Sequence, residues 1–530
     1  MNLLPSTTIR RYMYSKIRHV KPETLLILLV ILLGIFLRLF RLDIYPAGFH
    51  GDEGWTGIEA QRILRDGFIG FWSVAALGQA ALSYYWTALI FYLGGASIES
   101  ARFSFAILNS AVLPFYYLFL RKLFSRTTAL IASTAFTLGY IPITFARRAD
   151  FIAVSFSFFP ALYFFIRAFE TKSWKDFMLA GIFIGLSHHM YAGLWLAPLL
   201  FGLWTLYELA VRRKDATLFL IRTLAMVVVY LVVASPILYK AYTDPNSFFS
   251  RTKLVSIFSN TKHAQSYLPK EFTKSQLLLH NTYRTLGMFT HTTDPDVWNT
   301  FNRKPVFDPV SSVLFIAGLL LSIFFFSAKQ KVYIWSILLF FLIPAVITVD
   351  APSFRRGMVS IYISYVFVGF ALAFLLQKTK QYMPKMSLIS SVLVTGIVLG
   401  VSFYNSYLYF YQYAAGNAAK TVLAYPLVEV SKYINSKPQP LTVYFYSSRW
   451  SLRYETLQFL SPGLTGENRS KEFLPQAPTG EIKTPALFIF LPNYLNFVEE
   501  IEHQFPGGTK TNYYDTDGSI IFIGYHVASQ

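Results

Sequence analysis

Two adjacent carboxylates beside a long apolar segment are the first candidates for chemistry. Asp52 and Glu53 stand between glycines, which permit close approach of another backbone or of a ligand. A carboxylate held near a membrane face loses hydration, which raises its pKa and suits it to general-base work. The structural alternative is a solvated pair, or Asp52 as the N-cap of a helix that starts at Glu53 and stops near Gly67.

Two arginine pairs follow later in the chain. Arg147 and Arg148 precede Asp150, and Arg355 and Arg356 lie in a short segment between two apolar runs. The guanidinium group suits phosphate oxygens, so both pairs are candidate phosphate ligands. The alternatives are an Arg147–Asp150 ion pair at helical spacing and snorkelling of the second pair to lipid headgroups.

Two weaker features are His188-His189 and Asp308-Pro309. His189 is a candidate for lining a site, although buried histidines more often only satisfy hydrogen bonds. Metal binding by the pair alone is disfavoured, because adjacent residues on a helix point about 100° apart. Asp308 is interpreted as the N-cap of a helix with proline at its first position.

The composition places these residues in a membrane protein. Of 530 residues, 54% are hydrophobic and only 14% are charged, whereas about a quarter of the residues are charged in soluble proteins. Apolar runs such as Thr24–Phe40 and Ser311–Phe326 recur along the chain, and a helix needs about 17–25 apolar residues to cross a bilayer. The runs are continuous, which favours helices over a barrel. The first run ends in charges without a small-residue cleavage pattern, so it predicts an anchor and not a cleaved signal.

About eleven membrane-spanning helices are predicted. They are 23–41, 101–120, 127–145, 151–168, 176–192, 194–210, 217–239, 310–327, 331–349, 357–377 and 387–408. With the N-terminus on the cytoplasmic side, every inner connection is basic, as the positive-inside rule expects. These connections are 1–23, 121–126, 167–175, 212–222, 329–331 and 378–385.

Three parts follow from this topology: a cytoplasmic N-terminal segment 1–22, a transmembrane domain 23–410 and an extracytoplasmic domain 411–530. Two large outer loops, 42–100 and 240–309, belong to the transmembrane domain. Ala80–Ala96 is apolar enough to span, but a span there would place the basic connection 121–126 outside. We therefore expect a helix at the membrane interface, where its tyrosines and tryptophan are favoured.

The tail differs in pattern from the rest of the chain. Leu441–Tyr446, Ala486–Leu491 and Ser519–Val527 are short strand-like runs, with helical candidates at Ser451–Leu460 and Tyr494–Gln504. Strands that alternate with helices predict a small α/β domain.

Charge and cysteine content exclude some functions. The net charge of +19 falls in short loops between apolar runs, so it indicates membrane topology and not nucleic-acid binding. The chain has no cysteine, which excludes disulfides, thiolate metal sites and a cysteine nucleophile.

Several motifs together resemble a known family. FHGDEGWTGIEAQRILRDG (49–67) resembles the first-loop acidic motif of class C glycosyltransferases, and ARRADF (146–151) resembles their second acidic site. ESARFSFAILNS, RKLFSR and VFDPVSSVLFIAGLL resemble further segments in the same order. The closest branch is glycosyltransferase family 39, which includes dolichyl-phosphate-mannose–protein mannosyltransferases and the bacterial aminoarabinose transferase. The resemblance covers roughly residues 24–410 and implies that family's fold.

The resemblance implies inverting transfer of a sugar from a polyprenyl-phosphate donor to a hydroxyl of an acceptor protein, lipid or glycan at the outer membrane face. Asp52 would be the general base, Glu53 would orient it, and Asp150 would position the acceptor or the base.

Arginines would then stabilise the charge that grows on the departing phosphate. Arg355 and Arg356 are the first candidates, and Arg147 and Arg148 are next. The segment GQAALSYYW (78–86) carries no basic residue, whereas relatives often place one there for the lipid phosphate. A WWDYG-like motif, typical of oligosaccharyltransferases, is absent from the sequence. No cofactor is expected, and no divalent metal is indicated.

Three other classes of function are alternatives to glycosyl transfer. A transporter or flippase would also need many spans, but transporters place charged residues near the bilayer midplane and often contain repeats. A polymerase or ligase of lipid-linked polysaccharide would share the donor and the outer site. A non-catalytic scaffold is disfavoured by the intact acidic residues. The resemblance implies the inner membrane of a bacterium, with an archaeal membrane as the alternative, and a role in glycosylation of the cell envelope.

Overall fold

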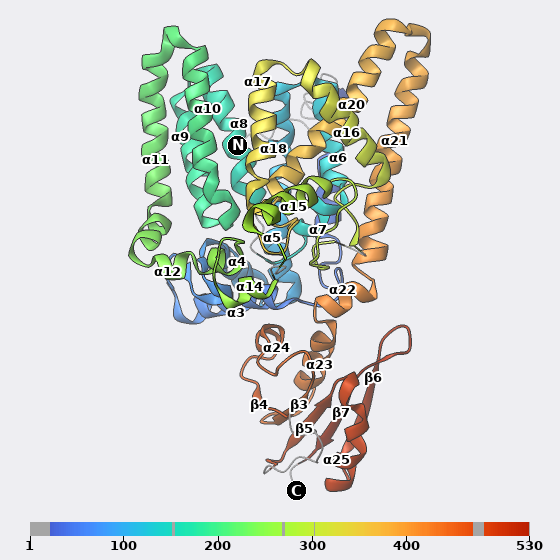
Figure 1. Cartoon of the computed structure of the whole chain (residues 1–530). Helices are drawn as coiled ribbons and strands as arrows, with labels where there is room; N and C mark the ends of the chain where they lie inside the picture. The colour runs from blue at the N-terminus through green and yellow to red at the C-terminus, as the bar shows by residue number, and fades with distance from the viewer. Residues whose placement is uncertain (1–21, 151–153, 268–270, 301–302, 470–481, 529–530) are drawn as a thin grey trace, which may run out of the picture. The chain divides into compact units, whose positions relative to one another are not determined.

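The chain forms two compact units in the computed structural model, which describes residues 22–150, 154–267, 271–300, 303–469 and 482–528. The helical unit comprises Met1–Phe40, Phe105–Arg147 and Phe151–Tyr409. The mixed unit comprises Arg41–Ser104, Arg148–Asp150 and Phe410–Gln530. Figure 1 shows the helices and strands of both units with their labels.

Helices lie at each of the predicted spans. They are α2 (Pro22–Leu39), α5 (Ile98–Leu123), α6 (Arg126–Leu138) with α7 (Tyr140–Ala146), α8 (Val154–Thr171), α9 (Trp174–Leu186), α10 (Ala197–Val211), α11 (Ala216–Thr243), α16 (Pro309–Phe325), α17 to α19 (Ala328–Val346), α20 (Met358–Tyr382) and α21 (Ser387–Tyr407). Among the described residues, seven helices are long and apolar enough to cross a membrane, or eight if α6 and α7 form one bent span. The other predicted spans coincide with α8, α9 and α16, of which α9 has 13 residues and α16 has 17.

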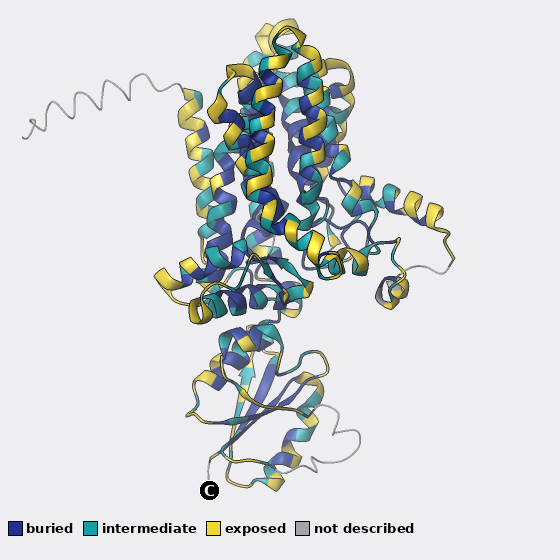
Figure 2. Ribbon diagram, turned by 90° about the vertical axis from the view of Figure 1, so that its left-hand side faces the viewer, coloured by how far each residue is buried: buried dark blue, intermediate teal, exposed yellow. Residues whose placement is uncertain are grey.

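Burial orders these helices from centre to edge. In α20, 78% of the most apolar 18-residue stretch is buried, whereas the corresponding share is 17% in each of the helices α2, α11 and α21. Figure 2 shows exposed residues in yellow along the outer helices. Apolar side chains that face outward all along a helix are expected where lipid is the solvent. At the centre, a Cβ on Gly318 of α16 would lie 1.9 Å from the Phe367 carbonyl oxygen of α20, so small residues permit the close helix packing typical of membrane proteins.

The span at 127–145 is broken at Gly139, where α6 and α7 meet at 55°. The break leaves backbone groups without helical partners, and in a membrane these groups must be satisfied inside the protein. Arg38 Nη1 donates to the Thr137 carbonyl at 2.9 Å, and Asn405 Oδ1 accepts from the Tyr140 amide at 3.0 Å. The break is therefore a stabilised feature that leads directly to Arg147.

Asp308 is the N-cap of α16, as predicted. Its Oδ1 accepts from the amides of Val310 and Ser311, each at 3.0 Å, and Pro309 occupies the first helical position. Before this helix lie the shorter helices of the second predicted outer loop: α12 (Pro245–Phe248), α13 (Ser250–Val255), α14 (Lys262–Tyr267) and α15 (Lys274–Gly287).

The mixed unit contains a five-stranded sheet in the order β4-β3-β5-β7-β6. Its strands are β3 (Thr442–Tyr446), β4 (Thr465–Asn468), β5 (Ala486–Phe490), β6 (Thr509–Tyr514) and β7 (Ile520–Val527). Strands β4, β3 and β5 are parallel, with Thr442 opposite Ala486, whereas β7 is antiparallel to β5 and β6. The predicted α/β domain is confirmed, and β3, β5 and β7 are the three strands that the sequence indicated.

Helices complete the mixed unit. They are α3 (Gly51–Asp66), α4 (Leu82–Gly94), α22 (Asn417–Val422), α23 (Tyr425–Asn435), α24 (Glu455–Leu460) and α25 (Val498–Gln504). A short β1–β2 ribbon (Trp72–Ser73 and Gln79–Ala80) joins α3 to α4. Helix α4 covers the predicted interface segment, and its 13 residues rise only about 20 Å, which is too short for the roughly 30 Å of a hydrocarbon core.

Candidate active site

Helix α3 begins one residue before Asp52, and His50 is its N-cap. His50 Nδ1 accepts from the Asp52 amide at 3.1 Å, while the His50 amide donates to Glu53 Oε2 at 3.1 Å. These two bonds form a capping box, which satisfies amides at the start of the helix. The alternative in which Asp52 itself caps a helix from Glu53 is therefore wrong, because His50 supplies the cap. Asp52 is half-buried in the first turn, where a carboxylate is electrostatically favoured.

Glu53 is fully buried and forms an ion pair with Arg102 of α5. Arg102 Nε and Nη2 donate to its two carboxylate oxygens at 3.0 and 3.1 Å. Burial raises the pKa of Glu53, but the charge of Arg102 and the hydrogen bonds from Arg102, Ala149 and His50 outweigh this effect, so the net pKa is lowered. Glu53 is thus held as an ionised anchor.

Arg102 also organises the loop that leads into α3. Its Nη1 donates to the carbonyls of Leu42 and Pro46 at 3.2 and 2.7 Å, and Nη2 donates to the Gly48 carbonyl at 2.5 Å. The guanidinium lies 5.5 Å from the ring centre of Phe49. The sequence analysis missed Arg102, whose only signal was its presence in the ESARF motif at the start of a span.

The second acidic segment joins the same cluster. The Ala149 amide donates to Glu53 Oε1 at 3.0 Å, which connects residues 148–150 to α3. Asp150 pairs with Arg148, and both side chains are fully buried. The sequence alternative of an Arg147–Asp150 pair is not what the structure shows, since Asp150 pairs with Arg148. Asp52, Glu53, Arg148 and Asp150 therefore belong to one unit.

Arg147 belongs to the helical unit and contacts other residues than Arg148 does. Its Nη1 and Nη2 donate to the carbonyls of Leu37 and Phe40 at the end of α2, each at 2.5 Å, and its Nε donates to the Tyr409 hydroxyl at 3.0 Å. Arginine at a helix C-terminus satisfies carbonyls that have no intrahelical partner. These contacts favour a structural role for Arg147.

The tail supplies two residues beside Asp52 that the sequence analysis missed. The Tyr454 hydroxyl accepts from the Gly51 amide at 3.3 Å. A Cβ on Gly51 would lie 2.9 Å from Glu455 Oε2. Burial raises the pKa of Glu455, and the charge of Asp52 raises it further. The carboxyl groups of Asp52 and Glu455, which lie far apart in the sequence, therefore interact electrostatically.

Glycines on α3 make this approach of α24 feasible. A Cβ on Gly54 would lie 2.7 Å from the Glu455 backbone, and one on Gly57 would lie 2.4 Å from the Phe459 ring. Gly51, Gly54 and Gly57 recur every third residue, so they share one helix face. The spacing was visible in the sequence, but its partner helix was not.

Arg356 lies in the helical unit and pairs with Asp350. Its Nη1 also donates to the Thr348 hydroxyl. Burial raises the pKa of Asp350, but Arg356 and hydrogen bonds from Thr348 and Arg356 outweigh that effect, so the net pKa is lowered. The Arg356 side chain remains 18% exposed, so it is accessible as well as paired.

Arg355 lies over the ring of Trp298, with 4.2 Å between the guanidinium carbon and the ring centre. The adjacent backbone is held by Asp294, whose Oδ2 accepts from the Phe354 amide at 2.7 Å and from Asn299 Nδ2 at 3.1 Å. Burial raises the pKa of Asp294 to about 7, although hydrogen bonds from the Phe354 and Asp296 amides act in the opposite direction. Asp294 was not among the predicted residues.

His188 and His189 contact helix α11. His189 Nε2 lies 2.8 Å from the Val233 carbonyl of α11, and His188 Nε2 lies 3.3 Å from the Tyr230 hydroxyl. These contacts agree with histidines that satisfy hydrogen bonds between helices. Within the described ranges, no group of three or more metal-ligating side chains is suited to a metal ion.

Comparisons with known proteins match the fold. A family model described as dolichyl-phosphate-mannose-protein mannosyltransferase matches residues 79–239. The structure of ArnT from Cupriavidus metallidurans bound to undecaprenyl phosphate is similar over 95% of this chain and 98% of that chain, with 15% identity and a TM-score of 0.53. A search of curated protein sequences gives no match.

A second similar structure is an oligosaccharyltransferase from Archaeoglobus fulgidus tethered with an acceptor peptide. The similarity covers 96% of this chain and 74% of that chain, with 12% identity and a TM-score of 0.52. The chain therefore has the fold of the class C membrane glycosyltransferases, as the sequence predicted, and the matching family and the fold neighbours are glycosyltransferases.

The buried pair predicts a strong stability effect. Arg102→Met would leave Glu53 charged and unpaired in the interior, which costs about 3–5 kcal/mol. We expect a large fall in the thermal unfolding temperature of the purified protein in detergent. Arg65→Met is the matched control, because Arg65 is 72% exposed in its pair with Asp66 and exposed ion pairs contribute little to stability. Equal stability of the two variants would contradict the assignment.

Asp294 predicts a pH-dependent contribution to stability. A carboxyl with a raised pKa binds a proton in the folded protein that the unfolded chain has already lost between about pH 4 and pH 7. This contribution is therefore fully present below about pH 4 and is lost as the pH rises to about 7, by up to about 4 kcal/mol. Thermal unfolding of wild type and Asp294→Asn across this range measures it. The unfolding temperature of wild type minus that of Asp294→Asn should fall with rising pH and become constant above pH 7. A temperature difference that does not change with pH would refute the raised pKa of Asp294.

Proposed function

We propose that this protein is an inverting glycosyltransferase that transfers a sugar from a polyprenyl-phosphate donor to an acceptor hydroxyl at the outer membrane face. The observation that carries the proposal is the placement of Asp52. It is half-buried in the first turn of α3, while the neighbouring Glu53 is fixed by Arg102 and Ala149. An accessible carboxylate on a rigid support is what a general base requires.

In this proposal Asp52 accepts the proton of the acceptor hydroxyl. The hydroxyl oxygen forms a bond to the anomeric carbon, and the bond from that carbon to the phosphate oxygen breaks. The electron pair leaves with the polyprenyl phosphate, and the proton stays on Asp52. Attack opposite the leaving group inverts the anomeric configuration.

The donor phosphate is assigned to Arg355 and Arg356. Positive groups fixed near the leaving phosphate stabilise the charge that develops on it. The undecaprenyl phosphate bound to the similar ArnT structure supports this donor class. Asp150, buried with Arg148, is assigned a positioning role through the segment that donates to Glu53.

No divalent metal is assigned to this reaction, since the basic residues would supply the charge stabilisation. The acceptor is a protein, lipid or glycan hydroxyl. The proposed orientation has a cytoplasmic N-terminus in the inner membrane of a bacterium, which the basic character of each predicted inner connection supports.

Asp52→Asn should reduce transfer by about 10²–10⁴-fold, because it removes the proton acceptor with little change in shape. The measurement is release of radiolabelled sugar from polyprenyl-phosphate hexoses by purified protein in detergent, with and without EDTA. Asp66→Asn, at the other end of α3, is the control and should retain activity. Activity that survives Asp52→Asn would place the base elsewhere, and loss of wild-type activity in EDTA would refute the metal-free assignment. No transfer by wild type with any donor and acceptor would favour the transporter alternative.

Arg356→Ala should raise the donor KM by about tenfold or more, because charge-assisted hydrogen bonds contribute about 1.5–3 kcal/mol. Arg356→Lys should lie between wild type and Arg356→Ala, since it retains charge without the planar fork. Steady-state kinetics at varied donor concentration distinguish the three proteins. Unchanged donor KM and turnover in Arg356→Ala would remove Arg356 from the phosphate site.

A further inference from the structure

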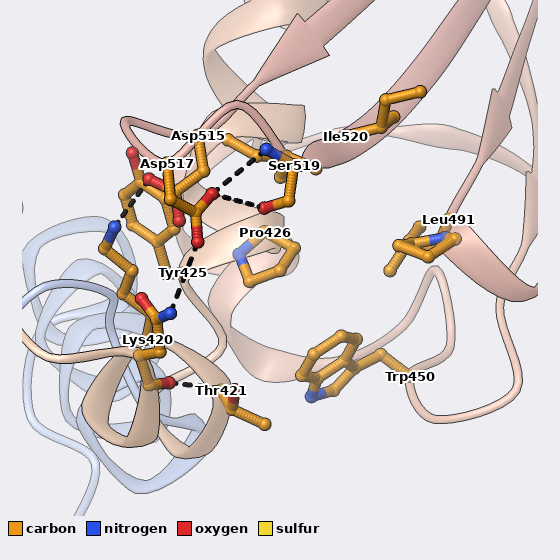
Figure 3. Close-up of a pocket in the computed structure, with 13 residues that line it drawn as sticks. Lys420, Thr421, Tyr425, Pro426, Trp450, Leu491, Asp515, Asp517, Ser519 and Ile520 are labelled. Atoms are coloured by element: carbon orange, nitrogen blue, oxygen red, sulfur yellow. Dashed lines mark hydrogen bonds and ion pairs between the residues drawn. The ribbon is translucent and has the colours of Figure 1, made fainter.

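The mixed unit contains a cavity of about 290 Å³ that the proposed reaction does not use. Figure 3 shows its lining, to which Trp450, Tyr425 and Pro426 contribute rings and Lys420, Asp515 and Asp517 contribute polar groups. This volume is close to the lower end of the range for ligand pockets, which is about 300–1,000 Å³. The cavity is therefore suited to a small ligand, about the size of one ring.

The cavity lies at an edge of the sheet where ligands commonly bind in α/β domains. In the order β4-β3-β5, the two strands that follow β3 in the chain lie on opposite sides of it. This reversal creates a topological switch point between the parallel strands β3 and β5. Trp450 follows the end of β3, and Leu491 and Pro492 follow the end of β5. Open α/β sheets bind ligands outside the carboxyl ends of strands at such a point.

Three other segments meet at the same edge. The β6–β7 turn contributes Asp515, Asp517 and Ser519, the start of α23 contributes Tyr425 and Pro426, and α22 contributes Asn417 and Lys420. Segments that are separate in the chain therefore supply both flat apolar surfaces and hydrogen-bonding groups to one cavity.

The charges of the lining disfavour an anionic ligand. Lys420 Nζ lies 2.5 Å from Asp515 Oδ1, so this cation is already neutralised. Asp517 accepts from Ser519 Oγ at 2.6 Å and from Asn417 Nδ2 at 3.3 Å. One negative charge then remains among these residues, and it would repel a phosphate or a carboxylate.

We propose that this cavity binds a neutral sugar ring of a glycan. The C–H face of a sugar ring is apolar and packs on flat side chains such as Trp450, while its hydroxyls both donate and accept. Asp517 accepts, Asn417 has a second amide hydrogen to donate and an oxygen that accepts, and Ser519 Oγ accepts while its hydrogen is donated to Asp517, which matches that pattern. The choice of carbohydrate rests on the proposed function, because a glycosyltransferase has glycan acceptors or products to hold.

Binding is measured on the full-length protein in detergent by saturation-transfer NMR. The probes are methyl α-mannoside, methyl β-glucoside and chitobiose, with glucose 1-phosphate and inorganic phosphate as anionic probes. We expect at least one neutral sugar to bind, with affinity at least about tenfold lower in Trp450→Ala. Trp174→Ala is the control, because Trp174 is 46% exposed and lies on α9, and it should bind as wild type does.

Trp450 packs against the core of the mixed unit, so a second variant is needed in case Trp450→Ala does not fold. Asp517→Asn changes an exposed side chain and should also weaken binding of the neutral sugar. Wild-type affinity in a folded Trp450→Ala or in Asp517→Asn, preference for the anionic probes, or no binding of any neutral sugar would overturn the proposal. The assay contains no lipid donor, so sugar binding that persists in Asp52→Asn separates this site from the proposed catalysis.

Discussion

The buried ion pair between Glu53 and Arg102 is the constraint on which the candidate site depends. Neither charge is exposed to solvent, so each requires the other, and removal of one partner would leave an unpaired charge in the interior. A buried pair contributes little net stability compared with apolar packing, but its directional hydrogen bonds select one geometry. Here that geometry joins the entry loop of α3, the start of α5 and the segment containing Ala149. Asp52, next to Glu53 in the chain, acquires its position from this junction.

The same helix is fixed from another side by the tail. Because Gly54 and Gly57 have no side chains, α24 approaches the backbone of α3 more closely than any larger residue would permit. The approach brings Glu455 into the electrostatic field of Asp52. A tail domain that touches the first turn of α3 in this way is part of the candidate site, and not an appendage to the transmembrane domain. The tail part of the mixed unit starts at Phe410, near the boundary that the sequence predicts, but the unit also includes Arg41–Ser104 and Arg148–Asp150 from the earlier part of the chain.

Features with a local signal were predictable, and features made by distant partners were not. The helices followed from continuous apolar runs, and β3, β5 and β7 followed from apolar strand patterns. Strands β4 and β6 are largely exposed and polar, so their pattern does not differ from that of a loop. The break at Gly139 lies in an apolar run and depends on Arg38 and Asn405, which are remote in the sequence. Asp52, Glu53 and Asp150 were identifiable as charges out of place, but Arg102 and Glu455 acquire meaning only from the residues that they meet.

Three of the four predicted phosphate ligands, Arg147, Arg148 and Arg356, differ in what a phosphate would have to displace. Arg147 donates to carbonyls at the end of α2, and those carbonyls would lose their partner if the guanidinium turned to another ligand. Arg148 is fully buried with Asp150, so a phosphate would have to lose its hydration shell to reach the Arg148 guanidinium. Arg356 is partly exposed, and its partner Asp350 is 31% exposed. Water can therefore hydrate Asp350 when Arg356 turns to a phosphate, and water can hydrate Arg356 when the phosphate leaves. Exchange of a carboxylate for a phosphate at Arg356 conserves its charge-assisted hydrogen bonding, which is why the segment after Asp350 is the better candidate for a group that must bind and leave in each cycle.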